Sequence, residues 1–215
     1  MKKRILSLAI SAALVLTMLP AGALAAGDKG TPPVYNKATG CYEISTPDQL
    51  LYLSGSWKDG APRDGHYVLT ADIDMSGVKG FKPIASKKDK GFIGTFDGQF
   101  HAIKGLRVEY EKKYAGLFGY VGNQDDQAYI KDVALLDCYV TGQQNVGALA
   151  GVNYGTITGC VVTGEVKCLD LSNSHTAGGI CGKLKEGEGP IVGHVEDCYV
   201  NADVSAPYDA GGVAG

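Results

Sequence analysis

The sequence predicts an all-β fold in which short strands wind into a parallel β-helix-like solenoid, with one short N-terminal helix as a cap. One observation is a glycine phrase that occurs four times, with closing glycines at 119, 151, 182 and 215. Spacings of 32, 31 and 33 residues are typical of repeat architectures. The other observations are the 31 glycines and the lack of a second amphipathic pattern, which exclude an α-solenoid. A β-sandwich is the alternative, because it also has evenly spaced short strands.

Residues 1–25 have the form of a signal peptide. A basic start at residues 2–4 precedes a mostly apolar run, and Ala23-Leu24-Ala25 has the small-x-small form of a cleavage site. We expect cleavage after Ala25 and no membrane span in the remaining chain, because no later stretch is long and apolar enough. Residues 26–40 are small, polar and proline-bearing, and are interpreted as a linker. The expected location is secreted or at the cell surface.

The expected mature chain is mildly acidic. It carries 17 basic and 23 acidic side chains, a formal charge of −6, and Arg63 and Arg107 are its only arginines. Nucleic-acid binding and attachment to an anionic membrane need a basic patch or run, which the sequence lacks. Both are therefore excluded.

Residues 41–110 predict a cap and the first β coils. Tyr42–Ile44 predicts a strand, and Ser45 or Thr46 can accept hydrogen bonds from the free N–H groups of a helix that begins at Pro47. The apolar side of this helix consists of leucines at positions 50, 51 and 53. We expect the helix to cover the first open edge of a stacked sheet, because an unpaired edge recruits other chains.

The next stretch alternates with the period of a strand. Ile73 and Met75 are predicted to face inward, and Asp72 and Asp74 outward. Asp97-Gly98 is a turn pair, because glycine accepts a positive φ and the aspartate can bond nearby N–H groups. The core candidates around it are Phe96, Ile103, Leu106 and Val108.

Residues 111–215 are interpreted as the repeats. One repeat divides into strands at Val146–Gly151 and Thr156–Val162, a third strand from Glu165, and a polar loop over residues 167–176. The three-strand part has the length of one β-helical coil. The structural repeat residues are Gly116, Leu117, Phe118, Gly119, Leu149, Gly151, Ile180, Gly182, Val213 and Gly215.

Several phrases closely resemble bacterial exported proteins that carry GLUG-motif repeats. They include Thr46-Pro47-Asp48-Gln49-Leu50, Gly94-Thr95-Phe96-Asp97-Gly98, Gly116-Leu117-Phe118-Gly119 and the recurring Val-Gly-Ala-Leu-Ala-Gly. The resemblance covers residues 41–215 and implies a right-handed β-helical solenoid, often one module of a longer adhesin-like chain. Similar modules also accompany immunoglobulin A peptidase domains. The family's motifs are mainly structural, so the resemblance implies no catalytic residue and no cofactor.

The sequence stops within a repeat phrase. A coil ending at Gly215 would leave its strands and its apolar interior open, which favours end-to-end association. We therefore expect the chain to be truncated, with further repeats, a cap or other downstream domains to follow.

Three acids are the candidates for chemistry. Asp72, Asp74 and Asp97 could bind a hard cation such as calcium, or join a lyase-type cluster with Arg107. The alternative is that they are solvent-face and turn residues, since no full calcium-loop spacing is present. The four histidines, at positions 66, 101, 175 and 194, show no metal spacing.

These patterns predict a non-enzymatic protein without a metal or cofactor, which acts as a stalk or adhesive segment. The first alternative is a polysaccharide-active β-helical enzyme, either a lyase or a hydrolase. The second is the accessory region of an exported peptidase, which would need a zinc-binding H-E-x-x-H motif that these residues do not contain.

Aromatic side chains near the first two phrases form a candidate binding face, made of Tyr110, Tyr114, Tyr120 and Tyr154. Exposed tyrosines can stack on sugars or dock a protein, so the expected partner is a host or cell-wall glycan or protein. The alternative is that these rings seal the loops over the core.

The six cysteines permit a disulfide framework. However, Cys160 and Cys198 occupy one repeat position, where the first repeat has Val133. A position that accepts Val or Cys is more simply a buried apolar site. We therefore expect free cysteines stacked in the core.

Overall fold

The computed structural model describes residues 30–55, 61–171, 175–185 and 191–215. In these ranges the chain forms eighteen strands, one α-helix and one short 3₁₀ turn, so the predicted all-β class is confirmed. The expected signal peptide, residues 1–25, lies outside the described residues. Within the expected linker, 26–40, the structure places a strand, β1 (Val34–Asn36). That interpretation was therefore wrong for part of its range, because the chain reverses at Gly40 and pairs β1 with the strand that follows.

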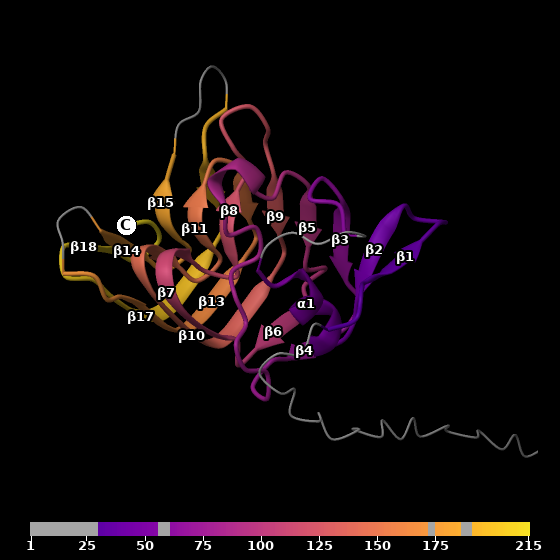
Figure 1. The fold of residues 1–215 in the computed structure, drawn as a ribbon, viewed down its shortest axis with the longest axis horizontal. Coiled ribbons are helices and arrows are strands. Elements are labelled where there is room, and N and C mark those ends of the chain that lie inside the picture. Colours follow the sequence, from indigo (N-terminus) through magenta and orange to yellow (C-terminus); the bar gives the residue numbers. More distant parts are fainter. Residues whose placement is uncertain (1–29, 56–60, 172–174, 186–190) are drawn as a thin grey trace, which may run out of the picture.

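The first sheet has seven strands and lies on one side of the molecule (Figure 1). Its strands are parallel except for the antiparallel pair of β1 and β2. In spatial order after β1 they are β2 (Cys41–Ile44), β3 (His66–Leu69), β5 (Thr95–Asp97), β9 (Tyr129–Lys131), β12 (Thr156–Thr158) and β16 (His194–Glu196).

The second sheet has eight strands, and its pairings are all parallel. Its centre is the long strand β10 (Ala134–Gly147), which pairs with β6 and β7 on one side and with β13 and β14 on the other. Its other members are β4 (Ile73–Asp74), β6 (Ala102–Lys104), β7 (Arg107–Ala115), β13 (Val161–Cys168), β14 (Thr176–Gly178), β17 (Tyr199–Ser205) and β18 (Asp209–Gly211).

The third sheet contains the repeated glycine phrases. It consists of β8 (Phe118–Val121), β11 (Ala150–Asn153) and β15 (Cys181–Leu184), and isolated bridges extend it to Ile84 and Ala214. Phe118 pairs with Ala150, Ala150 with Cys181, and Cys181 with Ala214. The residues in this register are 32, 31 and 33 positions apart, so the spacing of the phrases in the sequence is the pairing register of this sheet.

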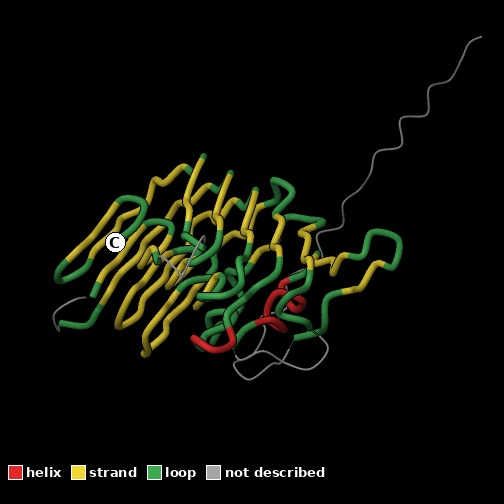
Figure 2. Tube along the Cα trace, turned by 90° about the horizontal axis from the view of Figure 1, so that it is seen from above, coloured by secondary structure: helices red, strands yellow, loops and turns green. Residues whose placement is uncertain are grey.

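The chain visits the three sheets in a fixed order. It passes through β9, β10 and β11, and then through β12, β13, β14 and β15. We call one such passage a level; the last level contains β16, β17 and β18. Figure 2 shows the strands of successive levels as parallel, stacked segments.

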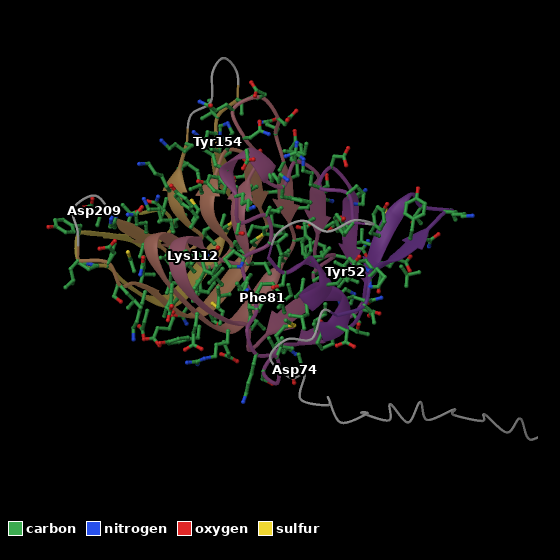
Figure 3. All side chains as sticks on the ribbon, viewed as in Figure 1. Tyr52, Asp74, Phe81, Lys112, Tyr154 and Asp209 are labelled. Atoms are coloured by element: carbon green, nitrogen blue, oxygen red, sulfur yellow. The ribbon has the colours of Figure 1, made fainter. Side chains whose placement is uncertain are left out.

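The core lies between the sheets and is built from rows of side chains in successive levels. In one row Phe96, Ile130 and Ile157 pair in register and are fully buried. The predicted core residues Ile103, Leu106 and Val108 are also buried, as are Ile73 and Met75. Phe81 is likewise buried in the core, whereas Asp74 lies at the surface of the molecule (Figure 3).

The single helix, α1 (Pro47–Leu53), begins as the sequence predicts. Thr46 accepts a hydrogen bond from the Gln49 N–H at 3.3 Å, and the Gln49 side chain accepts one from the Thr46 N–H. Its leucines are buried, and Figure 1 places the helix beside β4, at the N-terminal end of the eight-stranded sheet. The outer edge of the seven-stranded sheet is formed by β1 instead, so the helix does not cover that edge.

The strand boundaries within the repeat differ from the sequence interpretation. Val146–Gly151 spans the end of β10 and the start of β11, and Thr156–Val162 is divided between β12 and β13. The second division occurs at Gly159, whose φ of +63° turns the chain from one sheet to the next. Glu165 is therefore in the middle of β13 rather than at the start of a strand.

Candidate binding groove

A groove with a volume of about 570 Å³ lies on the eight-stranded sheet. Its floor and walls come from β7, from β10 and from the residues that follow β13. The lining residues are Glu109, Tyr110, Glu111, Thr141, Gly142, Gln143, Leu169, Asp170 and Leu171. Parallel pairing brings Glu109 beside Thr141, and Tyr110 beside Gly142, across a sequence gap of about thirty residues.

The groove carries three carboxylates. Glu109 accepts a hydrogen bond from Arg107 at 2.9 Å, and this contact lowers the pKa of Glu109 below its usual value. The Arg107 guanidinium also lies 4.2 Å from the centre of the Tyr139 ring, so it is held from two sides. Glu111 and Asp170 complete the acidic lining.

Two exposed leucines lie at the same groove. The side chains of Leu169 and Leu171 are 58% and 81% exposed. The Leu169 N–H donates to the Gly142 carbonyl at 2.8 Å, and Asp170 lies 3.3 Å from His175. These contacts hold the leucines beside the carboxylates. The groove therefore combines apolar surface with negative charge, which suits a ligand that has both apolar and cationic groups.

The candidate tyrosines do not form one exposed face. Tyr110 lines the groove but is partly buried against the core. Tyr114, Tyr120 and Tyr154 gather in a separate cluster with Val152 and Ile191; the rings of Tyr114 and Tyr120 are 4.8 Å apart.

Tyr120 and Tyr154 are only 4% and 5% exposed, and burial raises the pKa of both phenols. They cannot act as a stacking platform for sugars, so the predicted binding face is wrong for these two residues. Tyr154, seen near the upper loops in Figure 3, borders a smaller polar cavity of about 290 Å³.

The candidate acids are each engaged locally. Asp72 accepts hydrogen bonds from the Ala102 N–H at 3.0 Å and from Lys104 at 3.2 Å, and Asp97 lies 2.7 Å from Lys131. Asp74 accepts from the Ser76 N–H and hydroxyl. Across residues 30–55, 61–171, 175–185 and 191–215, no three metal-binding side chains gather in one place. Asp72 and Asp74 lie at the surface, Asp97 is buried in β5, and none of the three lines the groove.

Of the groove residues, sequence reasoning proposed only Tyr110, and the clearest omission is the loop after β13. Residues 167–176 read as a polar loop, although Leu169-Asp170-Leu171 places two large apolar side chains within it. Isolated leucines in a polar loop were the available signal. These leucines share the groove with Glu109 and Glu111 because of the register of β7, β10 and β13, which could not be inferred from any one strand.

All six cysteines are free, and five of them are buried. The expected position in the core is thus confirmed for those five, whereas Cys198 is half-buried. No helix among the described residues is long and apolar enough to cross a membrane.

Comparisons with known proteins give two relatives in sequence. The chain is 34% identical to halomucin of Haloquadratum walsbyi over 143 residues, which is 60% of this chain and 2% of halomucin. It is 32% identical over 101 residues to a protein of Evansella cellulosilytica with the provisional name Gly-rich membrane protein, covering 43% of this chain and 11% of that protein. The matches therefore span only a small part of either relative. No protein-family model matches the chain.

One solved structure overlays on most of the chain. It is a crystal structure of a protein from Bacteroides ovatus with the provisional designation immunoglobulin A1 protease. The overlay covers 87% of this chain and 86% of that one, with 17% identity and a TM-score of 0.41. A similarity this loose supports no assignment of fold or activity.

Proposed function

We propose that this chain is a non-enzymatic, right-handed β-helical module of an exported surface protein related to the GLUG-repeat proteins, and that its groove binds partner segments. The observation that carries the proposal is the register of the third sheet, in which the glycine phrases stack one above another. A stack of this kind gives each side of the molecule a regular outer face. Such a face is suited to binding extended partners or to spacing domains apart.

The fixed order of the sheets supports the β-helical part. Successive levels contribute strands to the same sheets, and neighbouring levels pair in parallel. Buried residues of neighbouring levels also stack, as Leu117, Leu149 and Ile180 do at 0% exposure. In a sandwich of antiparallel hairpins, sequential strands would pair in antiparallel fashion; among the described residues such a pair forms only between β1 and β2.

Location at the cell surface rests on two supports. The first is the signal-peptide pattern of the N-terminal residues. The second is the name of the Evansella relative, which describes that protein as a membrane protein. Since the matched stretch is 2% and 11% of the two relatives, we place the module within a longer chain.

The groove supports a binding role. Glu109, Glu111 and Asp170 favour a cationic ligand, while Leu169 and Leu171 offer apolar contact. Exposed large apolar side chains beside charges are typical of binding sites for peptide segments. We propose that the partner presents a segment with alternating basic and apolar side chains.

The test is binding of a labelled peptide of alternating Lys and Leu to the full chain, measured by fluorescence anisotropy, with an alternating Glu and Leu peptide as the charge control. The proposal expects roughly tenfold tighter binding of the basic peptide. It also expects roughly tenfold weaker binding of that peptide to a Glu111→Gln, Leu171→Ser variant.

A matched control is Leu184→Ser, which changes an exposed leucine on β15 outside the groove. This variant is expected to bind like the wild type. Equal binding of the basic peptide to the groove variant and the wild type would refute the proposed site. Binding of a glycan at the groove, with no binding of either peptide, would refute the proposed partner.

A further inference from the structure

Two cysteines occupy equivalent places in the last two levels of the stack. Val161 of β13 pairs with Tyr199 of β17, and the Tyr199 N–H donates to the Cys160 carbonyl at 2.9 Å. Cys160 and Cys198 are the residues directly before this pair, so they lie side by side on adjacent, parallel segments. Neighbouring strands are about 5 Å apart, which is within the Cα separation that a disulfide spans.

Both sulfurs also lie against the backbone of β12. The Cys160 sulfur lies 3.2 Å from the Thr158 carbonyl, and the Cys198 sulfur lies 3.8 Å from the carbonyl of the preceding residue, Ile157. The interaction between the two neighbouring thiols lowers the pKa of Cys198 to about 7 and raises that of Cys160. Cys198 is half-buried and Cys160 fully buried, so a reagent from solvent meets Cys198 first.

We propose that Cys160 and Cys198 are a redox-active pair, which a small-molecule or protein disulfide donor converts into a disulfide joining the last two levels. The Cys198 thiolate attacks the donor disulfide, forms a mixed disulfide and releases one donor thiolate. Cys160 then gives up its proton and attacks the Cys198 sulfur, expelling the second donor thiolate. The donor is reduced to two thiols, and the two cysteine thiols are oxidised to one disulfide.

The place of β17 in the eight-stranded sheet indicates which part of the molecule the disulfide would stabilise. Strand β17 is the last strand of its path in the eight-stranded sheet, with β13 as its only neighbour there. Its inward residues Val200 and Val204 are only partly buried, whereas Val162 and Val166 of β13 are fully buried. Among the described residues, β17 is therefore packed less tightly than β13, which favours its local opening. A disulfide from Cys198 to Cys160 restrains this level against the one beneath it.

The test is oxidation of the full reduced chain with oxidised glutathione, followed by alkylation, non-reducing digestion with trypsin and chymotrypsin, and mass spectrometry. Cleavage at Tyr139, Tyr154 and the lysines separates Cys160 and Cys198 from the other cysteines. The expected product is a Cys160–Cys198 cross-linked peptide, with a loss of two hydrogens and of two alkylated thiols. In the intact oxidised protein, amide exchange in β17 is expected to slow at least about tenfold, while exchange in β10 is unchanged.

Cys181 provides the internal control, because burial and the nearby Cys198 raise its pKa to about 12. The variant Cys181→Ser is expected to keep the cross-link, and Cys198→Ser to lose it. Free, alkylatable Cys198 after oxidation would overturn the proposal, as would a Cys181–Cys198 link or unchanged exchange in β17. The cross-link is mapped in the wild-type chain. The test therefore gives a result even if a variant fails to fold.

Discussion

Buried side chains in neighbouring levels lie one above another, and each supports the row above and below. Leu149 is fully buried, and its N–H donates to the Ile180 carbonyl of the next level at 3.0 Å. A gap in such a row cannot be closed by local movement, because the backbones on both sides are hydrogen-bonded. A truncated side chain therefore leaves a cavity.

We predict that Leu149→Ala lowers the free energy of unfolding by about 3 kcal/mol. The matched change Leu171→Ala, at a leucine that is 81% exposed, is expected to alter it by less than about 0.5 kcal/mol. Urea unfolding followed by circular dichroism measures both. Similar losses in the two variants would contradict the stacked core.

A pH effect is expected at Asp72. The hydrogen bond from the Ala102 N–H, followed by that from Lys104, lowers the pKa of this carboxyl. The folded pKa is thus below the unfolded value of about 3.9, so the contribution is present above the unfolded pKa and is lost as pH falls through the folded pKa. Because the Asp72 side chain is 54% exposed, screening limits the contribution to about 0.5 kcal/mol.

The measurement is the difference in unfolding free energy between wild type and Asp72→Asn across pH 2–7. We expect the wild type to be more stable at neutral pH and the difference to vanish at the acidic end, with a smaller difference in 1 M salt. A difference in unfolding free energy that grows as the pH falls would contradict the stabilisation of the Asp72 carboxylate by the Ala102 N–H and Lys104.

At the scale of elements, the N-terminal helix depends on its cap. Thr46 and Gln49 satisfy each other's backbone N–H groups, which is a capping box. We predict that Thr46→Ala costs about 1 kcal/mol of unfolding free energy, while Thr46→Ser, which keeps the hydroxyl, costs much less. Denaturant titration compares the two; equal losses would mean that the hydroxyl is not the stabilising group.

The corner between β10 and β11 needs glycine for a steric reason. A Cβ on Gly147 would lie 2.3 Å from the Ala150 carbonyl oxygen and 2.5 Å from the Cys181 Cα, both of them backbone atoms. We predict that Gly147→Ala costs about 2 kcal/mol. Gly212→Ala is the control, because nothing lies within 4 Å of its added Cβ. Thermal unfolding of the two variants measures the contrast, and a control as destabilised as Gly147→Ala would contradict the close approach.

At the scale of the whole molecule, part of the fold follows from the sequence alone. The phrase spacing gives the register of the third sheet, and the cap at Thr46 and the core position of Phe96 follow from local patterns. The division of residues 156–162 between β12 and β13 does not follow from the sequence. It depends on the positive φ of Gly159, which turns the chain from one sheet to the next.

The candidate site was less accessible to sequence reasoning. Tyr114 meets Tyr120 because the chain turns at Tyr114, whose φ is +69°, and this buries rings that a simple alternation would leave exposed. The groove likewise combines residues of β7, of β10 and of the segment after β13, so it can be recognised only once the register of these strands is known.

The parallel stacking of levels is the central claim, and nuclear Overhauser contacts measured by solution NMR test it most directly. Contacts are expected between the side chains of Ile130 and Ile157 and between those of Ile157 and Val195, which pair in register. Strand pairs of the three sheets should show the parallel pattern, with the antiparallel Hα–Hα contacts confined to β1 and β2. Hα–Hα contacts between sequential strands such as β12 and β13 would instead indicate an antiparallel sandwich and contradict the stack.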